Sequence, residues 1–385
     1  MATPSSRGAQ PSSERGRAHP SVHRGAGSKA TVTRDDALSE SLEARANRLV
    51  ALAKTRKRPL ILTHDNPDPD SVAAALALAQ IFEEKAGLKA AIAYGGIIGR
   101  TENRALLKVL KLPIVPISRI DFDEFDLFCL VDTQPQMGNH SLPPDHPANV
   151  ILDHHPERTG SRDAEIAEVG GDYGATSTIA ALYLRTLGIV PTREVATALF
   201  YGIKADTRDL GRETEDVDVQ AYLWLFPQAD KEALALIEHP KLPAEYFRLY
   251  HTAIEKGRVH GNAVMADLGD IYSPDMVAEV AERHLFLEGI KWSLAYAIYE
   301  DNLFLSLRTN DKRMNAGRLI REVVEELGGS AGGHGQMAGA RIPVQKLGKA
   351  QREEFKSGLV RRFCEEWGVA GKPGIPLLAY DPRAD

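Results

Sequence analysis

One short stretch of the chain crowds acidic and imidazole side chains together. Residues 63–71 read Thr-His-Asp-Asn-Pro-Asp-Pro-Asp-Ser, and apolar runs lie directly before and after them. A helix N-cap needs only one short polar side chain, which Asp70 or Ser71 could supply. The other carboxylates repel one another unless something positive lies among them. The stretch therefore indicates either a solvated turn or a cation site.

Similar residues end other apolar segments further along the chain. Asp132 ends the run Phe-Cys-Leu-Val-Asp, and residues 153–155, Asp-His-His, end the run that starts Val-Ile-Leu. Asp206 follows an apolar helical pattern. In open α/β sheets, ligands bind outside the carboxyl ends of the strands. We therefore expect these groups to meet those of residues 63–71 at one edge of a sheet.

The chemistry of this set favours divalent metal ions. Several carboxylates in a partly buried site resist ionising together, and cations remove that penalty. The donors are oxygen and imidazole nitrogen without thiolate, which suits Mg²⁺ or Mn²⁺, and the histidines favour Mn²⁺. Two ions about 3.5–4 Å apart can activate water and stabilise an in-line displacement on phosphorus. Each motif alone also fits a solvated loop or a helix cap, but their joint occurrence favours the metal interpretation.

The chain that positions these groups alternates between strand and helix patterns. Strands that are apolar on both faces alternate with helices, which predicts an α/β fold with a doubly wound, mostly parallel sheet. A charged helical segment then leads to a smaller α/β unit that contains a glycine-rich turn, and we expect the active site in the cleft between the two domains. The expected parts are a disordered basic tail at 1–35, a catalytic domain at 36–217, a helical linker at 218–258, a substrate-binding domain at 259–350, and a C-terminal helix and tail at 351–385.

Bulk properties narrow the function classes. The 385-residue chain has a formal net charge of −6, which argues against an electrostatic grip on long nucleic acid but allows a small anionic substrate. Only Cys129 and Cys364 are present, so a disulfide framework is not expected. The sequence shows neither an apolar run that could span a membrane nor the apolar core of a signal peptide. We therefore expect a cytoplasmic protein without a membrane partner.

The order of the motifs resembles that of the DHH phosphoesterase superfamily. The series is His-x-x-x-Asp-x-Asp from residue 64, then Val-Asp-Thr, Asp-His-His and Ala-Asp-Thr. The later Gly-Gly-His-Gly-Gln-Met-Ala-Gly-Ala, preceded by Ser-Leu-Arg-Thr-Asn-Asp-Lys-Arg-Met-Asn-Ala-Gly, is similar to the DHH-associated domain of that superfamily. The likeness covers residues 54–344. It departs at Pro69 and Ser71, where such proteins usually have glycine and alanine, and neither change removes a charged group.

The resemblance implies two metal ions, which would be Mn²⁺, with Mg²⁺ as the alternative. The matched acids and histidines would be their ligands. The first ion would be bound by His64, Asp68 and Asp132. The second would be bound by Asp70, Asp132, His154 and Asp206, so that Asp132 would bridge the two ions.

The resemblance also implies the remaining roles in the site. Asp153 would orient a metal ligand by hydrogen bonding, and His155 would face the substrate phosphate as a donor. The glycines of the second domain would let the backbone approach the substrate closely. The second-domain residues that would bind a substrate phosphate or nucleotide are Arg308, Gly332, Gly333 and His334.

Several activities are known in proteins that this chain resembles. Single-strand exonucleases of the RecJ kind carry an additional nucleic-acid-binding domain, manganese pyrophosphatases lack the Gly-Gly-His loop, and membrane-type cyclic-dinucleotide hydrolases need transmembrane helices. What remains resembles the stand-alone oligoribonucleases, or nanoRNases, which often also convert 3′-phosphoadenosine 5′-phosphate to AMP. The resemblance therefore implies a phosphodiesterase that degrades short single-stranded RNA or DNA oligonucleotides, or dinucleotides, to mononucleotides.

Other interpretations stay open at this point. The chief alternative is a phosphodiesterase for cyclic di-AMP or its linear dinucleotide product. A single-strand-specific exonuclease and a non-catalytic nucleotide sensor are weaker alternatives, and a sensor would be expected to lack a metal ligand, whereas none is missing. Homodimers are common in such families, although no stretch of this sequence demonstrates one.

Overall fold

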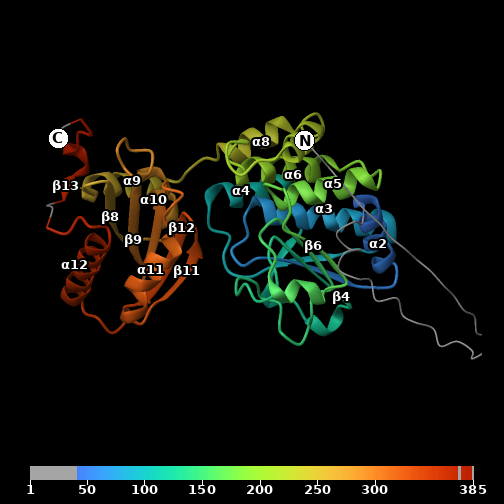
Figure 1. Ribbon diagram of the computed structural model, residues 1–385, viewed down its shortest axis with the longest axis horizontal. Helices are drawn as coiled ribbons and strands as arrows, with labels where there is room; N and C mark the ends of the chain where they lie inside the picture. The colour runs from blue at the N-terminus through green and yellow to red at the C-terminus, as the bar shows by residue number, and fades with distance from the viewer. Residues whose placement is uncertain (1–40, 372–373, 384–385) are drawn as a thin grey trace, which may run out of the picture. The chain divides into compact units, whose positions relative to one another are not determined.

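The computed structural model describes residues 41–371 and 374–383 (Figure 1). Two sheets organise this part of the chain, and each has hydrophobic clusters of its own. The basic tail expected at 1–35, and the first few residues of the expected catalytic domain, lie outside the described residues. Among the described helices, none combines the length and apolar character needed to cross a membrane.

The first sheet has six strands, and every neighbouring pair is parallel. The strands are β1 (Pro59–Thr63), β2 (Ala91–Tyr94), β3 (Ile114–Pro116), β4 (Leu127–Val131), β5 (Val150–Asp153) and β6 (Ile166–Val169). Strands β1, β4 and β5 are buried along their whole length, which explains why their sequences are apolar on both faces. The predicted parallel sheet is confirmed. The short strands β3 and β6 were not predicted.

The order of the strands, β3-β2-β1-β4-β5-β6, creates a switch point between β1 and β4. The chain runs outward from β1 in one direction, then returns to β4 and runs outward in the other. In such sheets a crevice forms outside the carboxyl ends of the strands at that point. Because β1 and β4 end directly before His64 and Asp132, the topology places the first two motifs next to each other.

Helices cover one face of this sheet, and irregular segments cover the other (Figure 1). The helices are α2 (Leu42–Ala53), α3 (Pro69–Ala86), α4 (Thr101–Leu110), α5 (Thr176–Thr186) and α6 (Arg193–Asp206). Their apolar side chains share one core with Ile61 and Leu152 of the strands. On the opposite face, Leu60 and Leu130 pack among residues such as Phe122, which belongs to a short 3₁₀-helix. The α/β fold with a parallel sheet is confirmed, and turns take the place of α-helices on its second face.

Helix α3 begins inside the first motif. Its N-cap is Asp68, whose Oδ1 accepts a hydrogen bond from the Ser71 backbone N–H at 3.0 Å. Pro69 fits the first turn because that position needs no backbone donor, and Gly87 ends the helix in the left-handed conformation at φ +70°. The expectation that Asp70 or Ser71 is the N-cap is wrong. Asp70 instead turns into the buried interior, and Ser71 is the capping partner three residues after Asp68.

The second sheet has seven strands in the order β11-β12-β10-β9-β8-β7-β13. They are β7 (Arg258–His260), β8 (Ala263–Asp270), β9 (Trp292–Tyr299), β10 (Asn302–Thr309), β11 (Ser330–His334), β12 (Met337–Pro343) and β13 (Ile375–Pro376). Only β8 and β9 pair in parallel; the other pairs of the described sheet are antiparallel. This mixed sheet confirms the expected smaller α/β domain.

The glycine-rich segment that we predicted as a turn forms most of a hairpin. β11 and β12 pair antiparallel, with Gly332 opposite Gly339. Small residues were mistaken for a loop signal, whereas here they allow two strands to pair at the edge of a sheet. Helices α9 (Ala244–Lys256) and α10 (Asp275–His284) share one cluster with this sheet, and α11 (Ala316–Val324) and α12 (Lys349–Glu366) share another.

The segment between the two sheets is helical. It contains α7 (Asp216–Leu225), α8 (Lys231–Glu238) and α9. Apolar residues of α7 and α8 belong to the core of the first sheet, whereas those of α9 belong to a cluster of the second. The domain boundaries that we assigned from the sequence stay predictions.

Candidate metal centre

His64 follows β1 and lies between two carboxylates. Its Nε2 is 3.6 Å from Asp68 Oδ1 and 3.5 Å from Asp132 Oδ2, while its Nδ1 is 2.9 Å from the backbone oxygen of Asp65. That carbonyl can only accept, so Nδ1 is the donor and Nε2 is the nitrogen that faces the acids. Burial opposes a charge on the ring, but hydrogen bonds to Asp132 and Asp68 hold the pKa of His64 well above its usual value. The pair of acids favours a positive charge at this position.

Asp132 lies at the centre of the cluster. It follows β4 in the left-handed conformation, with φ +58°, which costs about 1–2 kcal/mol for a residue with a side chain. Its backbone N–H donates to Leu152 O at 2.9 Å, and the Thr176 hydroxyl donates to Asp132 Oδ1 at 2.9 Å. Its Oδ1 is also 3.7 Å from His154 Nε2. Strain of this kind persists where the surroundings hold it, which is typical of functional sites.

A second group of ligand atoms gathers around His154. Its Nε2 is 3.4 Å from Asp206 Oδ2, and Asp70 completes the group. Asp206 is the last residue of α6. Burial and the negative charge of Asp68 raise the pKa of Asp206 to about 6. Burial and the charges of Asp132 and Asp206 likewise raise the pKa of Asp70 well above its usual value.

Asp70 is held from behind by the start of helix α5. Its two carboxylate oxygens accept hydrogen bonds from the backbone N–H groups of Thr176 and Ser177, each at 2.7 Å. The first turn of a helix offers backbone donors and a favourable dipole for an anion. The carboxylate is therefore fixed in orientation although it is almost fully buried.

The residues present fit divalent metal ions. Ligand atoms lie within 4.8 Å of one another in three overlapping groups of oxygen and nitrogen donors, without sulfur. Burial and the charges of neighbouring carboxylates raise the pKa of Asp70 and of Asp206, and bound cations would oppose both effects. The groups are His64 with Asp68 and Asp132, Asp70 with His154 and Asp206, and Asp132 with His154 and His155.

The structure thus brings together the residues that we expected to bind each ion, and their individual roles stay predictions. The third group differs from the expectation because it includes His155, to which the sequence analysis gave a substrate role alone. His155 Nδ1 is 2.8 Å from Asp153 Oδ1 and 3.7 Å from Asp132 Oδ1, so its nearest partner is the buried Asp153.

Asp153 links His155 to a buried glutamine that the sequence analysis missed. Asp153 Oδ1 accepts from His155, and its Oδ2 accepts from Gln134 Nε2 at 2.7 Å. Gln134 Oε1 in turn accepts from the Arg158 backbone N–H at 2.7 Å and from the Ser161 hydroxyl at 2.8 Å. Gln134 is two residues after Asp132, and this closeness to a motif was the one signal that could have singled it out.

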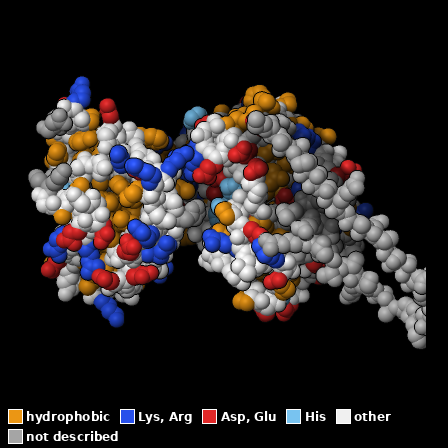
Figure 2. All heavy atoms as spheres, in the orientation of Figure 1, with side chains coloured by type: hydrophobic (Ala, Val, Ile, Leu, Met, Phe, Trp, Pro, Cys, Tyr) orange, Lys and Arg blue, Asp and Glu red, His pale blue; other side chains and the backbone are white. Residues whose placement is uncertain are grey.

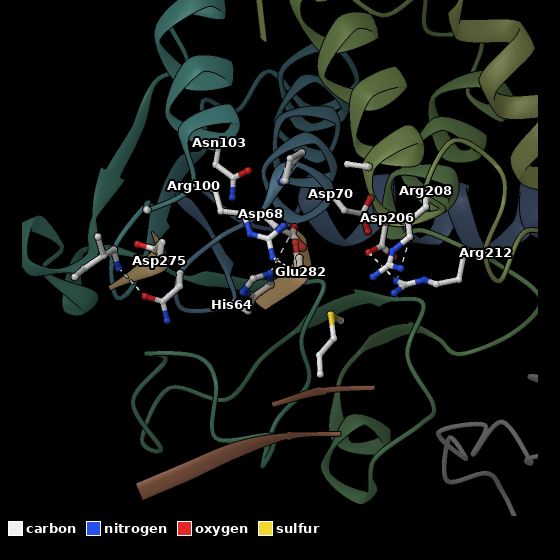
Figure 3. Close-up of a pocket in the computed structure, with 16 residues that line it drawn as sticks. His64, Asp68, Asp70, Arg100, Asn103, Asp206, Arg208, Arg212, Asp275 and Glu282 are labelled. Atoms are coloured by element: carbon white, nitrogen blue, oxygen red, sulfur yellow. Dashed lines mark hydrogen bonds and ion pairs between the residues drawn. The ribbon is translucent and has the colours of Figure 1, made fainter. Parts of the chain in front are cut away.

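A cavity of about 450 Å³ opens beside the cluster (Figure 3). Figure 3 shows His64, Asp68, Asp70 and Asp206 around it, together with three arginines. On the face seen in Figure 2, histidine, acidic and basic side chains lie side by side over the first domain. The arginines that line the cavity are Arg100, Arg208 and Arg212, and the residues from the second domain that line it are Asp275, Glu282 and Met337.

Arg308 is buried and paired rather than exposed to this cavity. Its Nη1 donates to the backbone oxygens of Leu307 and Ala338, each at 3.0 Å, and its Nε is 3.3 Å from Glu282 Oε1. The same carboxylate oxygen is 2.7 Å from Arg100 Nη2. A substrate phosphate would therefore have to compete with Glu282 for Arg308.

The glycines of the second domain differ in what they require. A Cβ at Gly333 (φ +127°) would overlap Met337 O and Ala338, so hairpin packing alone explains this glycine. A Cβ at Gly332 would meet nothing within 4 Å, so the structure gives no packing reason for glycine there. The backbone of His334 pairs with Met337 in the hairpin, and its side chain lies outside what the structure describes.

Comparison with known proteins agrees with the fold and the motifs. Residues 58–203 match the family model described as the DHH family, N-terminal domain, and residues 260–358 match the DHHA1 domain. The chain therefore contains a DHH domain followed by a DHHA1 domain. The first matched region contains strands β1 to β6 of the first sheet, and the second contains strands β8 to β12 of the second sheet.

Two proteins of Methanocaldococcus jannaschii are similar to this chain in sequence. The uncharacterized protein MJ1633 of Methanocaldococcus jannaschii is 37% identical over 303 residues, which are 77% of this chain and 61% of that protein. MJ0988 of the same organism is 25% identical over 241 residues, 57% of this chain and 68% of that protein. The chain therefore spans less than two thirds of the length of MJ1633.

A solved structure shares the fold of this DHH protein. The crystal structure of an exopolyphosphatase-related protein from Bacteroides fragilis superimposes with a TM-score of 0.64, over 83% of this chain and 96% of that chain. The sequence identity is 15%, so the likeness speaks for the fold alone.

Proposed function

We propose that this DHH protein is a metal-dependent phosphodiesterase that hydrolyses short single-stranded oligonucleotides to mononucleotides. The observation that carries the proposal is the pair of ligand groups on either side of Asp132. Two bound divalent ions would supply activated water and neutralise charge at phosphorus. Mn²⁺ is the favoured ion because imidazole and carboxylate donors are mixed, and Mg²⁺ is the alternative.

His155 would donate a hydrogen bond to the substrate phosphate. Burial opposes a charge on its ring, but the hydrogen bond to Asp153 and the charge of Asp132 raise the pKa of His155 to about 9. In the protein without metal, this favours an imidazole that is protonated on both nitrogens at neutral pH. Nδ1–H is directed to Asp153, and Nε2–H would be the group that donates to a phosphoryl oxygen.

The second domain would hold the far end of the substrate. Gly332 is exposed on β11, where added side-chain atoms would meet nothing, so a nucleotide could approach the backbone there. A net charge of −6 suits a substrate with few phosphates, because affinity for long polymers requires many phosphate contacts. Some activity on 3′-phosphoadenosine 5′-phosphate is part of the proposal.

A product time course with Mn²⁺ tests the proposal. The substrates are 5′-labelled RNAs from two to about twenty nucleotides, 3′-phosphoadenosine 5′-phosphate and cyclic di-AMP. Rapid loss of the shortest RNAs alone is expected. Preference for the cyclic dinucleotide, or steady digestion of the twenty-mer, would contradict the proposed substrate, and no hydrolysis of any of them would contradict the activity.

Two variants control the experiment. Asp132→Ala removes the carboxylate that two of the three ligand groups share and serves as the blank. Asp123→Ala removes an acid of the same domain whose side chain is 93% exposed, and it should keep wild-type activity. Normal turnover by Asp132→Ala would exclude the central role of that residue.

A further inference from the structure

The loop after α6 directs two arginines toward the candidate metal centre. Arg208 and Arg212 both line the cavity, and Figure 3 shows their guanidinium groups converging on Asp206. Neither residue belongs to a motif that the sequence analysis used. Like charges that converge in this way repel each other unless an anion lies between them.

The backbone holds these arginines in an unusual conformation. Arg208, Asp209 and Leu210 all have left-handed φ, between +49° and +62°, although none is glycine. Each such residue costs about 1–2 kcal/mol. Thr207 secures the turn: its backbone oxygen accepts from Arg212 N at 2.8 Å and its hydroxyl accepts from Leu210 N at 3.1 Å. The chain therefore maintains a strained loop that presents the two side chains.

Hydrogen bonds within the protein use only a few of the N–H donors of Arg208 and Arg212. Arg212 Nη2 donates to the backbone oxygen of Asp206 at 3.1 Å and lies 3.7 Å from its Oδ1. Arg212 Nε is buried and has no hydrogen-bond partner among the described residues. Within the same part of the chain, the Arg208 side chain makes neither a hydrogen bond nor an ion pair, whereas Arg100 pairs with Glu282 at 2.7 Å. Each guanidinium offers five N–H donors.

The charge balance of the site points to an anion beyond the reacting phosphate. Two divalent cations would balance the four carboxylates of the two ligand groups, so Asp206 could not also neutralise the arginines. The charges of Arg208 and Arg212 are then not neutralised by these four carboxylates, whereas Arg100 is paired with Glu282. A phosphodiester carries one negative charge, whereas a terminal phosphate monoester carries close to two near neutral pH. Guanidinium groups bind such phosphates with paired hydrogen bonds.

We infer that Arg208 and Arg212 form a second phosphate subsite, which binds a terminal phosphate monoester of the substrate while the neighbouring phosphodiester is hydrolysed. The inference rests on the proposed function and narrows it. The substrate class is then a dinucleotide or short oligonucleotide that carries a terminal phosphate, at either its 5′ or its 3′ end.

Kinetics on matched dinucleotides test the subsite. The substrates are diadenosine monophosphate without a terminal phosphate, and the same dinucleotide with a 5′- or a 3′-phosphate. The wild-type protein with Mn²⁺ should prefer one phosphorylated form by tenfold or more in kcat/KM. In Arg208→Gln this ratio should fall about tenfold, equivalent to about 1.4 kcal/mol, with unchanged manganese content. Arg208→Lys should restore part of it.

The control variant is Arg193→Gln, which changes an exposed arginine at the other end of α6 and should keep the wild-type ratio. Equal loss of kcat/KM on all three dinucleotides in Arg208→Gln would overturn the inference, because the arginine would then act on the reacting phosphate. A wild-type protein that hydrolyses all three dinucleotides equally would also overturn it, while the proposed function would stand.

A binding measurement separates failure of the proposed function from failure of the phosphate subsite. Calorimetric titration uses non-hydrolysable analogues of the same dinucleotides, with a methylene group in place of the bridging oxygen. If nothing is hydrolysed, the proposed function fails. A preference for the phosphorylated analogue that Arg208→Gln loses would still support the subsite, and equal affinity for the analogues with and without the terminal phosphate would overturn it.

Discussion

At the scale of single residues, the site is built from side chains whose orientation is fixed by buried partners. Asp70 is fixed by two backbone donors of α5, and Asp132 by the Thr176 hydroxyl and a left-handed backbone. Burial and neighbouring carboxylates of like charge together raise the pKa of Asp206 to about 6. This arrangement costs free energy in the protein without metal, so its presence is best explained by the ions that it would bind.

The chain from Gln134 through Asp153 to His155 leads to a prediction. Gln134→Leu removes the donor to Asp153 Oδ2 and leaves a buried carboxylate oxygen with one partner fewer. Asp153 then holds the His155 ring less firmly, and we expect kcat to fall about tenfold or more, with a smaller change in KM. Steady-state kinetics on a dinucleotide, with manganese content measured in parallel, checks this.

A second buried glutamine provides the control. Gln80 also makes hydrogen bonds through both atoms of its amide, away from the ligand groups. Its Nε2 donates to Glu84 Oε1 at 2.7 Å, and its Oε1 accepts from the Thr192 backbone N–H at 3.2 Å. Gln80→Leu should lower stability without lowering kcat. If Gln80→Leu and Gln134→Leu reduced kcat equally, the effect would be one of general stability, and the positioning role of Gln134 would be excluded.

At the scale of elements, Asp68 has two duties that substitution can separate. It is the N-cap of α3 and a member of the first ligand group. Asparagine caps a helix as well as aspartate does, whereas alanine costs about 1 kcal/mol. We expect both Asp68→Asn and Asp68→Ala to bind less manganese, and the midpoint of thermal unfolding without metal to be about 2–4 °C lower for Asp68→Ala than for Asp68→Asn. Full manganese binding by Asp68→Asn would show that Asp68 is not a metal ligand.

Helix α10 carries a buried histidine that makes the second domain sensitive to acid. Burial lowers the pKa of His284 to about 4, and its Nδ1 has no hydrogen-bond partner among the described residues. The unfolded chain binds a proton near pH 6.5, so between pH 6.5 and 4 the unfolded state takes up a proton that the folded state does not. Stability is therefore present above pH 6.5 and is lost as the pH falls, by about 2 kcal/mol from pH 7.5 to 5.

The variant His284→Leu should lose this pH dependence. We expect the difference in unfolding free energy between pH 7.5 and 5 to shrink by about 2 kcal/mol in denaturant titrations at the two pH values. His251→Gln is the control, because the His251 side chain is 77% exposed and its removal should leave the difference unchanged. An unchanged difference in His284→Leu would show that another group governs the acid sensitivity.

Sequence reasoning succeeded where one physical signal was sufficient. Strands β1 and β4 are apolar on both faces because they are central and parallel, and acids after such strands must meet at one edge of the sheet. It failed where the signal was spread over distant parts of the chain. β3 has three residues of intermediate burial, and Gln134 gains its meaning only from contacts with residues 153–161. Arg208 and Arg212 are ordinary surface residues by composition, and only the left-handed loop directs them into the cavity.

At the scale of the whole molecule, the two domains should respond differently to metal. All members of the three ligand groups belong to the first domain, and the second sheet has separate hydrophobic clusters. A ligand that binds the folded state alone stabilises by about 2.7 kcal/mol at one hundred times its dissociation constant. Because multidomain proteins unfold in more than one step, we expect Mn²⁺ to raise the midpoint of one calorimetric transition and to leave the other in place.

The size of this shift should depend on pH, because protons compete with metal for the same ligands. The pKa of Asp206 is about 6 and that of His64 is raised well above its usual value. Both groups lose their protons, as metal ligands must, only at higher pH: Asp206 becomes a carboxylate and His64 a neutral imidazole. We therefore expect a larger gain in the first transition at pH 8 than at pH 6, measured by scanning calorimetry with Mn²⁺ against a chelator. Asp132→Ala should lose most of the gain at both pH values, whereas His284→Leu should keep it. Equal movement of both transitions, or a gain that is the same at pH 6 and 8, would show that manganese binds outside the ligand groups of the first domain.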